Sequence, residues 1–512
     1  MLLYDVVSAS KAVAATRSRL AKREALATLL RRLTPEEAPV AISYLAGYLP
    51  QGRVGVGYAL VSKLDPGPPP DAPRLGLLEV HRRLGELARI QGPGSKKRRT
   101  QALGALFASA RPDERRFLGG LLVGELRQGA LVGVMTEAVA DATGIDGSAL
   151  RRAAMLAGDV VPVATAALTE GAASLARFEL TLFRPVLPML ASPAEDVEVA
   201  LERLGEAAFE VKLDGARVQV HKAGDEVRVY SRRRHDVTAG VPEIVEAVRA
   251  FEAEELILDG EAIALRPDGS PHAFQTTMRR FGRRSKVEEM RASLPLSHLY
   301  FDVLYQEGQS LIDTPAAERI ARLDTLLPDA HRVERVRTSD PEEASAFYDR
   351  ATGAGHEGLM AKSLAAGYEA GSRGFSWLKL KPAHTLDLVV LAVEEGSGRR
   401  RGWLSNLHLG ARDGAGGFVM LGKTFKGMTD AMLAWQTERL RELALGEEGY
   451  VLHVKPELVV EVAFSDVQES PHYPGGLALR FARLKAHRPD KSAADAATLD
   501  EVRAIHAKGH RA

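Results

Sequence analysis

The segment FEVKLDGARVQVHK (residues 209–222) decides how the rest of the chain is interpreted. The run Phe209–Val211 is β-like, and Asp214-Gly215 predicts a tight turn just after Lys212. A lysine at the end of a strand can point into a pocket. An exposed lysine in an ordinary β-turn has the same four-residue pattern, Lys-x-Asp-Gly. The weight of the pattern therefore depends on segments elsewhere in the chain.

Lysine needs a particular environment to act as a nucleophile, because its reference pKa of roughly 10.4 keeps it protonated near neutral pH. Desolvation or nearby cations favour the free amine. The segment WLKLKP supplies Lys379 and Lys381, which lie two residues apart and therefore share one face of a strand. These two cations would favour the free amine of Lys212 and would also hold the phosphates of a nucleotide.

Two further segments supply carboxylates. LILDGEA carries Asp259 and Glu261, and HEGLMAK carries Glu357 and Lys362. Each carboxylate alone is compatible with a capped turn or a surface ion pair. Together with a nucleophilic lysine they match what nucleotidyl transfer requires, namely oxygen ligands for Mg²⁺ and cations to balance charge on phosphorus.

Length and composition exclude several classes of protein. With 512 residues, 45% of them hydrophobic and 26% charged, the chain is too long for one compact core, so several domains are expected. No apolar run reaches the roughly 20 residues that a transmembrane helix needs, and the first thirty residues resemble an amphipathic helix, so a cytoplasmic protein without membrane contact is expected. Without cysteine, any metal must be bound by oxygen or imidazole.

The net charge of +1 conceals an uneven distribution. Residues 1–184 contain 25 Lys and Arg against 17 Asp and Glu, a formal +8, which leaves −7 for the remainder. The densest basic cluster is Lys96, Lys97, Arg98 and Arg99, in a Gly/Pro loop before a helical stretch. Such a cluster is either a phosphate contact or merely a solvated loop.

Hydrophobic periodicity divides the chain into three parts. Up to about residue 182 apolar residues recur at three and four, which predicts an all-α domain. Residues 183–382 alternate short β-like runs with helices, which predicts an α+β domain. Residues 383–512 contain several short strands and a helix near MLAWQTERLRELAL, which favours a small barrel of the oligonucleotide-binding type, the OB-fold.

Taken in chain order, these segments resemble the motif set of the lysine-dependent nucleotidyltransferases, specifically the bacterial-type three-domain ATP-dependent DNA ligases. The resemblance implies that Lys212 is the adenylated residue, that Glu210 reads the adenine and that Arg217 lies near the nucleotide. The other expected nucleotide contacts are Arg232 in YSRR, Glu261 at the ribose, Phe301 in LYFDVLY stacked on adenine, and Lys379 and Lys381 at the phosphates.

The last motif of the family is matched by RFARLKAHRPDK (residues 480–491) in the third part of the chain. Arg488, Asp490 and Lys491 are expected to orient the pyrophosphate leaving group. Pro489 is a departure, because its fixed φ constrains the two side chains beside it.

The resemblance also implies the cofactors and the substrate. ATP supplies the AMP, and Glu261 and Glu357 are the expected ligands of Mg²⁺, for which Mn²⁺ can substitute. GELRQG (residues 124–129) resembles the helical DNA-binding domain of longer ligases. A monomer closing around nicked duplex DNA in the bacterial nucleoid is expected, serving repair, replication or recombination. The expected DNA contacts are Arg232, Lys96, Lys97, Arg98, Arg99 and Arg127.

Other functions share part of this pattern. An mRNA-capping guanylyltransferase or an RNA ligase has the same lysine motif, but neither accounts for the basic helical part. An NAD-dependent ligase has a cysteine zinc site, which this chain lacks. A noncatalytic clamp for DNA breaks would be expected to have lost Lys212, Glu357 or Lys381, and all three are present.

Overall fold

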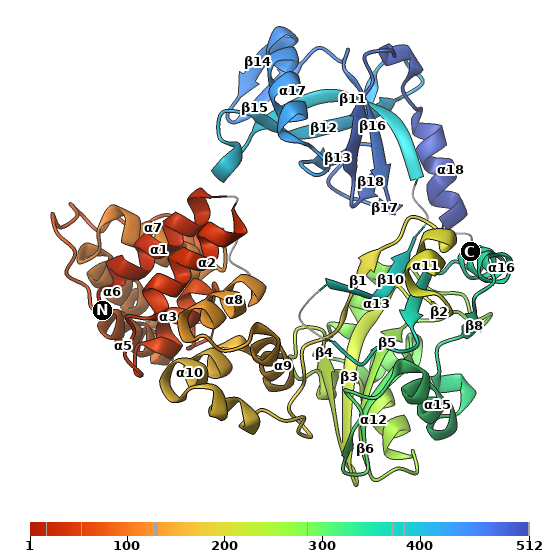
Figure 1. Ribbon diagram of the computed structural model, residues 1–512. Helices are drawn as coiled ribbons and strands as arrows, with labels where there is room; N and C mark the ends of the chain where they lie inside the picture. Colours follow the sequence, from red (N-terminus) through yellow and green to blue (C-terminus); the bar gives the residue numbers. More distant parts are fainter. Residues whose placement is uncertain are drawn as a thin grey trace.

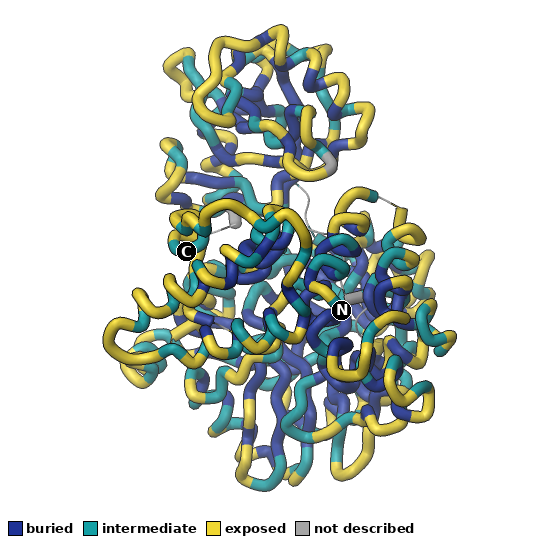
Figure 2. The backbone as a smooth tube through the Cα atoms, turned by 90° about the vertical axis from the view of Figure 1, so that its left-hand side faces the viewer, coloured by how far each residue is buried: buried dark blue, intermediate teal, exposed yellow. Residues whose placement is uncertain are grey.

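Three regions of different secondary structure follow one another along the chain and are arranged as a ring (Figure 1). The computed structural model describes residues 1–16, 18–52, 54–126, 132–283, 285–369, 373–381 and 384–509. Buried backbone gathers inside each region, while exposed segments lie on the outside (Figure 2). No described helix combines the length and the apolar character that a membrane span requires.

The first region is helical, as the spacing of its apolar residues predicts. Its helices begin at residues that satisfy free backbone N–H groups: Ser18 caps α2, Asp146 caps α9 and Asp159 caps α10. Their apolar faces form one continuous core. The helices are α1 (Leu3–Ala15), α2 (Arg19–Leu30), α3 (Ala38–Leu45), α4 (Tyr58–Val61), α5 (Leu77–Arg89), α6 (Ser95–Ala108), α7 (Pro112–Val123), α8 (Val132–Thr143), α9 (Gly147–Ala157), α10 (Val160–Glu170) and the 3₁₀ helix η1 (Ala172–Arg177).

The central region is built on two five-stranded sheets. One has the strand order β1-β10-β9-β2-β8 and the other β4-β3-β5-β6-β7. The strands are β1 (Leu190–Pro193), β2 (Ala207–Val211), β3 (Ala216–Ala223), β4 (Glu226–Ser231), β5 (Glu255–Ile263), β6 (Ser297–Gln306), β7 (Gln309–Ser310), β8 (Arg335–Thr338), β9 (Leu359–Ser363) and β10 (Arg373–Leu380). The covering helices are α11 (Val197–Leu204), α12 (Pro242–Arg249), α13 (Phe274–Phe281), α14 (Val287–Ser293), α15 (Ala316–Leu326) and α16 (Pro341–Gly353), with 3₁₀ turns η2 (Thr238–Gly240) and η3 (Asp329–His331).

The segment FEVKLDGARVQVHK (residues 209–222) connects these two sheets. Its first strand, β2, is an inner strand of one sheet, between β9 and β8, and its second, β3, is an inner strand of the other, between β4 and β5. Residues 212–215 therefore pass from one sheet to the other, between two rigid layers. This position fixes the nucleophile segment from both sides.

The third region is rich in strands. Its main sheet has the order β13-β12-β11-β15-β14, with β16 pairing both β11 and β19. Its elements are β11 (His384–Glu395), η4 (Gly398–Arg400), β12 (Leu404–Arg412), β13 (Phe418–Thr424), α17 (Asp430–Glu442), β14 (Ala444–Glu448), β15 (Val451–Val454), β16 (Val459–Phe464), β17 (Asp466–Glu469), β18 (Leu477–Arg480), β19 (Arg483–His487), η5 (Ala493–Asp495) and α18 (Leu499–Gly509). The described strand pairings do not close the sheet into a barrel.

Contacts between the regions complete the ring. Met155 and Leu156 of α9 are buried in one apolar cluster with Ile257, Leu304 and Trp377 of the central region. At the other end of the ring, η4 of the third region lies against α1 of the first.

The linker between the first and central regions is fastened by polar side chains of β3 and β4. The backbone N–H of Phe183 donates to His221 Nδ1 at 2.9 Å, and the Tyr230 hydroxyl donates to the Phe183 carbonyl at 2.8 Å. Gln219 Oε1 accepts from the Val186 N–H at 2.8 Å. Linkers between domains are usually free and solvated, so these bonds make this linker a rigid connection.

His221 should give the protein a specific weakness in acid. Burial lowers the pKa of His221 to about 3, below its usual value near 6.5. The unfolded chain therefore binds a proton below pH 6.5 that the folded chain refuses, so stability falls as pH drops from 6.5 toward 3. We expect His221→Asn, which keeps an acceptor but takes no proton, to show a shallower decline in urea-unfolding free energy between pH 6.5 and 4. Equal slopes for both proteins would contradict this assignment.

Candidate active site

The expected nucleophile lies in direct contact with the expected metal-binding carboxylate. Lys212 Nζ forms an ion pair with Glu357 Oε2, and Lys381 Nζ forms another with Glu357 Oε1. All three side chains are largely buried. These residues belong to three separate motifs of the sequence, and the fold brings them together in one cluster.

Backbone hydrogen bonds fix this cluster. The N–H of Lys212 donates to the Gly358 carbonyl at 2.9 Å, and the N–H of Glu357 donates to the Lys212 carbonyl at 3.1 Å. They extend the antiparallel pairing of β2 with β9. Lys381 follows β10, which pairs with the other edge of β9, and Lys379 precedes it by two residues on the same face.

Burial and the neighbouring charges shift the pKa values of Glu357 and Lys381. Burial acts to raise the pKa of Glu357, but Lys212 and Lys381 outweigh it and hold that pKa below its usual value. Burial and the charge of Lys212 lower the pKa of Lys381. Glu357 is therefore ionised at neutral pH.

Glu261 behaves differently from Glu357. Burial raises the pKa of Glu261 to about 8, although Lys212 and Arg217 act against the shift. At neutral pH its carboxyl is therefore mostly protonated in the absence of nucleotide. A protonated carboxyl can both donate and accept, which suits a contact with a ribose hydroxyl.

Glu210, expected to read the adenine, is engaged by two cations. Its Oε2 accepts from Lys362 Nζ at 2.6 Å, and its Oε1 lies 3.0 Å from Arg335 Nη2. Lys362 also lies over the ring of Phe301, 4.5 Å from its centre. Arg335, on β8, was not identified from the sequence, because no motif surrounds it.

Arg217 is directed into the protein beneath Phe301. Its guanidinium bonds both oxygens of Asp259, at 3.0 and 2.7 Å, and lies 5.4 Å from the centre of the Phe301 ring. The Asp259 partner was named from the sequence only as a carboxylate at a strand end.

The third region contacts the nucleophile segment through a residue that the sequence analysis missed. Arg480 Nη1 donates to Asp214 Oδ2 at 2.9 Å, and its guanidinium lies 5.1 Å from the centre of the Phe274 ring. Arg480 is the first residue of the segment compared with the last ligase motif, so closer attention to that segment would have named it.

The three residues expected at the pyrophosphate have partners within their own region. Arg488 bonds both oxygens of Asp490, at 2.9 and 2.6 Å, and lies 3.5 Å from Asp387. Lys491 also bonds Asp387. In this arrangement Arg480, at the start of the last motif, reaches the nucleophile segment, whereas Arg488, Asp490 and Lys491 bond within their own region.

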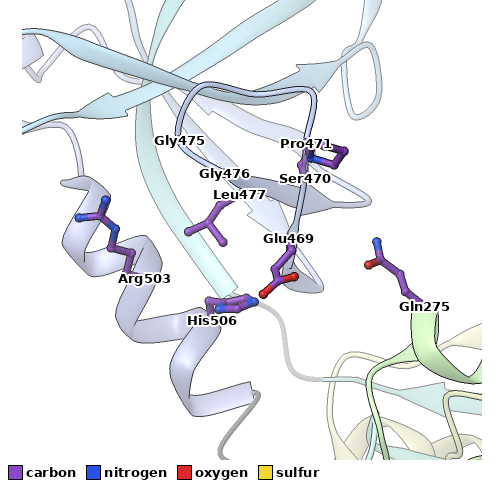
Figure 3. Close-up of a pocket in the computed structure, with 9 residues that line it drawn as sticks. All are labelled: Gln275, Glu469, Ser470, Pro471, Gly475, Gly476, Leu477, Arg503 and His506. Atoms are coloured by element: carbon purple, nitrogen blue, oxygen red, sulfur yellow. The ribbon is translucent and has the colours of Figure 1, made fainter.

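A hollow of about 560 Å³ lies between the central region and the third region (Figure 3). Gln275 of α13 faces it from the central region, while Glu469 of the β17–β18 hairpin and His506 of α18 face it from the third region. The Glu469 carboxylate points toward the His506 ring (Figure 3).

The described residues among the expected DNA contacts lie outside the cluster of Lys212, Glu357 and Lys381. Arg98 bonds the Gln91 carbonyl and Arg99 bonds the Ile90 carbonyl, each at 2.6 Å, so these two arginines hold the loop before α6. The expectation of a loop at residues 96–99 is wrong, because Lys96, Lys97 and the two arginines all lie at the start of α6, which begins at Ser95. Arg232 is exposed in the turn after β4. Arg127 lies outside the described residues.

Comparison with known proteins identifies the family. Residues 62–140 match the family model for the DNA ligase N terminus, residues 188–381 the ATP dependent DNA ligase domain, and residues 400–491 the ATP dependent DNA ligase C terminal region. The chain is 60% identical to a probable DNA ligase of Anaeromyxobacter sp. (strain Fw109-5), over 99% of this chain and 98% of that one.

The chain belongs to the ATP-dependent DNA ligases. A probable DNA ligase of Mycolicibacterium gilvum (strain PYR-GCK) is 56% identical over the full length of both chains. A solved structure named Pmar-Lig_PreS3 shares the fold, with a TM-score of 0.62 and 18% identity over 94% of this chain and 99% of that one. The strand-rich third region contains residues 400–491, which match the ATP dependent DNA ligase C terminal region.

The residues of this ligase suit a magnesium ion that shares its ligands with a nucleotide. Mg²⁺ is usually held by one or two carboxylates together with substrate phosphates and water. Glu357 is ionised and partly accessible, and Glu261, near the same lysine, would join it as a ligand once the positive charge of the ion displaces the proton of its carboxyl. The described residues contain no group of three His, Asp or Glu that could hold a metal alone. Phosphate oxygens would have to complete the site.

Two glycines of the ligase site allow strands to approach closely. A Cβ at Gly215 would lie 2.4 Å from the Ala262 carbonyl oxygen, and one at Gly358 would lie 2.1 Å from the Leu380 carbonyl oxygen. Neither backbone oxygen can move without disturbing its sheet. The glycines of these motifs are therefore sterically required.

We expect Gly215→Ala to separate the nucleophile segment from β5. The change should lower stability by about 1–3 kcal/mol, the usual cost of overpacking, and slow adenylation of Lys212 at least tenfold. Thermal unfolding and initial rates of protein labelling would measure both. Gly205→Ala, where a Cβ meets no atom within 4 Å although φ is +67°, should lose stability without losing labelling. Equal loss of labelling in both variants would contradict the steric explanation.

Proposed function

We propose that this ligase seals nicks in duplex DNA by carrying AMP on Lys212. The observation that supports this proposal most strongly is the buried pairing of Lys212 with Glu357 and Lys381, beside the contact with the third region. A lysine in such surroundings is held in one orientation. The family uses ATP, and the cluster of Lys212, Glu357 and Lys381 offers the charges that ATP requires.

In the first step, the unprotonated amine of Lys212 attacks the α-phosphorus of ATP. The new N–P bond forms as the P–O bond to pyrophosphate breaks, which leaves a lysine–AMP phosphoramidate. Lys379 and Lys381 hold the phosphates, Phe301 lies under the adenine, and Glu261 binds the ribose. A bound Mg²⁺, held by Glu357 and Glu261, would neutralise phosphate charge.

In the second and third steps the AMP leaves the protein. A phosphate oxygen of the DNA 5′-end attacks the AMP phosphorus and the Lys212–phosphorus bond breaks, giving a DNA-adenylate. Arg232, exposed after β4, holds the 5′-phosphate by charge-assisted hydrogen bonds. The 3′-hydroxyl then attacks that phosphate, forms the phosphodiester bond and releases AMP.

The three regions correspond to three proposed domains. Residues 1–182 form the helical DNA-binding domain, residues 183–382 the adenylation domain, and residues 383–512 an OB-fold domain. We propose that a monomer closes all three around the duplex, with Lys96, Lys97 and Arg127 at phosphates and Arg98 and Arg99 beside them. Arg488, Asp490 and Lys491 would orient pyrophosphate after the third domain turns. The substrate is then nicked DNA of the nucleoid, in repair, replication or recombination.

Protein labelling tests the first step. With Mg²⁺ and ATP labelled at the α-phosphate, we expect one acid-labile, hydroxylamine-sensitive phosphoramidate label on each chain, and none on Lys212→Ala. Addition of nicked duplex should discharge the label and join the strand. Label that persists in Lys212→Ala would contradict the mechanism. Labelling by GTP in place of ATP would favour a capping enzyme, and failure to discharge on nicked DNA would point to another acceptor.

The contact between Arg480 and Asp214 should matter for sealing rather than for labelling. We expect Arg480→Ala to slow closure of a pre-adenylated nick about tenfold, since the third domain loses its direct bond to the nucleophile segment, and to retain Lys212 labelling. Arg483→Ala removes an equal charge from an exposed position on β19. Equal slowing in the two variants would show that both arginines act by general attraction to DNA, and not that the Arg480–Asp214 bond positions the third domain.

A further inference from the structure

Tyr368 has no role in the proposed mechanism, although it lies where the linker from the helical region meets both sheets of the central region. It belongs to the loop between β9 and β10, only 1% of it is exposed, and its backbone N–H donates to the Ile312 carbonyl at 2.7 Å. Tyr368 lies between the motif segments HEGLMAK and WLKLKP and belongs to neither. Its hydroxyl, however, contacts three groups around the nucleotide site.

The hydroxyl of Tyr368 uses its full bonding capacity. It donates to Asp259 Oδ2 at 2.7 Å, and it accepts from the backbone N–H of Met189 at 3.0 Å and from Arg217 Nη2 at 3.2 Å. A phenol has one hydrogen to donate and two lone pairs to accept with. Burial raises the pKa of Tyr368 well above its usual value, so the hydroxyl stays protonated and remains a donor.

Through these bonds Tyr368 helps to hold the wall expected behind the adenine. Asp259 and Tyr368 orient Arg217, whose guanidinium lies 5.4 Å from the centre of the Phe301 ring and 5.5 Å from that of Trp377. Trp377 packs edge-on against both Tyr368 and Phe301, each at 5.9 Å between ring centres. A contiguous set of rings therefore joins Tyr368 to the expected adenine platform.

The same hydroxyl binds the linker from the helical region. Met189 donates to Tyr368 through its N–H, and its carbonyl accepts from Arg217 Nη1 at 2.6 Å. Asp313, the residue after Ile312, bonds Arg152 of α9, with Nη2 to Oδ2 at 2.6 Å. Tyr368 thus bonds Met189 of the linker and Ile312, which is followed by the aspartate that bonds α9 of the helical region.

We propose that Tyr368 is a positioning residue for ATP: it holds Arg217, and with it the Phe301–Trp377 wall, in the binding geometry while the linker of the helical region is docked. This inference rests on the proposed adenylation of Lys212. It assigns to Tyr368 an effect on nucleotide affinity, transmitted through Arg217, and no contact with the reacting atoms.

Tyr368→Phe tests the positioning role. The change keeps the ring against Trp377 but leaves the Met189 N–H without its acceptor and Arg217 with one bond fewer. We expect the KM for ATP in Lys212 labelling to rise about tenfold while the maximal labelling rate changes less than threefold. Initial rates over a range of labelled ATP concentrations, with the full chain, would give both values.

Tyr305→Phe is the matched control. It also removes a hydroxyl that bonds a carboxylate, Glu255 at 3.0 Å, but at the outer end of β6. Its KM for ATP should match that of the unaltered chain. A Tyr368→Phe variant with lowered thermal stability and an unchanged KM would overturn the proposal, because a purely structural role predicts that result.

A double-mutant cycle tests the connection to the helical region. Arg152→Ala removes the bond to Asp313, and we expect it also to raise the KM for ATP, with an effect that is not additive with Tyr368→Phe. Additive effects would overturn the connection to the linker. If the unaltered chain takes no label from ATP, the proposed function itself fails; if it is labelled and Tyr368→Phe has a normal KM, only this inference fails.

Discussion

Two backbone hydrogen bonds between Lys212 and the Glu357-Gly358 pair support everything else at this site. They continue the β2–β9 ladder past the end of β2, so that the lysine and the carboxylate leave neighbouring strands at the same level. Close approach there requires Gly358, because any Cβ would collide with the Leu380 carbonyl. Lys381 then completes the cluster from the next strand. The charges meet because a sheet holds them, and their mutual attraction alone would not order three flexible side chains.

The passage of residues 212–215 between two sheets explains why so many partners converge. Asp214 reaches Arg480 of the third region, and Arg217 at the start of β3 reaches Asp259 on β5. One short segment thus contacts both sheets of the adenylation region and the C-terminal region. The linker from the helical region arrives at the same place, where Met189 bonds Arg217. The central region, the C-terminal region and the linker that leads from the helical region therefore meet around this segment.

The sequence predicted the residue types of the site better than their partners. Lys212, Glu357 and Lys381 were named from motifs, and the fold unites them. Glu210 was expected at the adenine, yet both its oxygens contact cations, one of them on β8, where no motif marks it. Tyr368 was missed because a lone tyrosine has no periodic or spaced signal, whereas Arg480 was overlooked although it opens the segment RFARLKAHRPDK. The expected barrel closure is also absent from the described pairings, since strand pairing across a barrel depends on curvature that local sequence does not encode.

By itself the sequence determined the order of three regions, the helical character of the first, and the motif residues that mark the family. These properties are local: hydrophobic period, turn residues and short motifs lie within a few positions of one another. Only the tertiary structure decided which charged side chains pair, that burial raises the pKa of Glu261 while two lysines lower that of Glu357, and that Arg480 rather than Arg488 faces the nucleophile segment. Those outcomes depend on burial and on distances between strands far apart in the chain, and such quantities exist only once the sheets have formed.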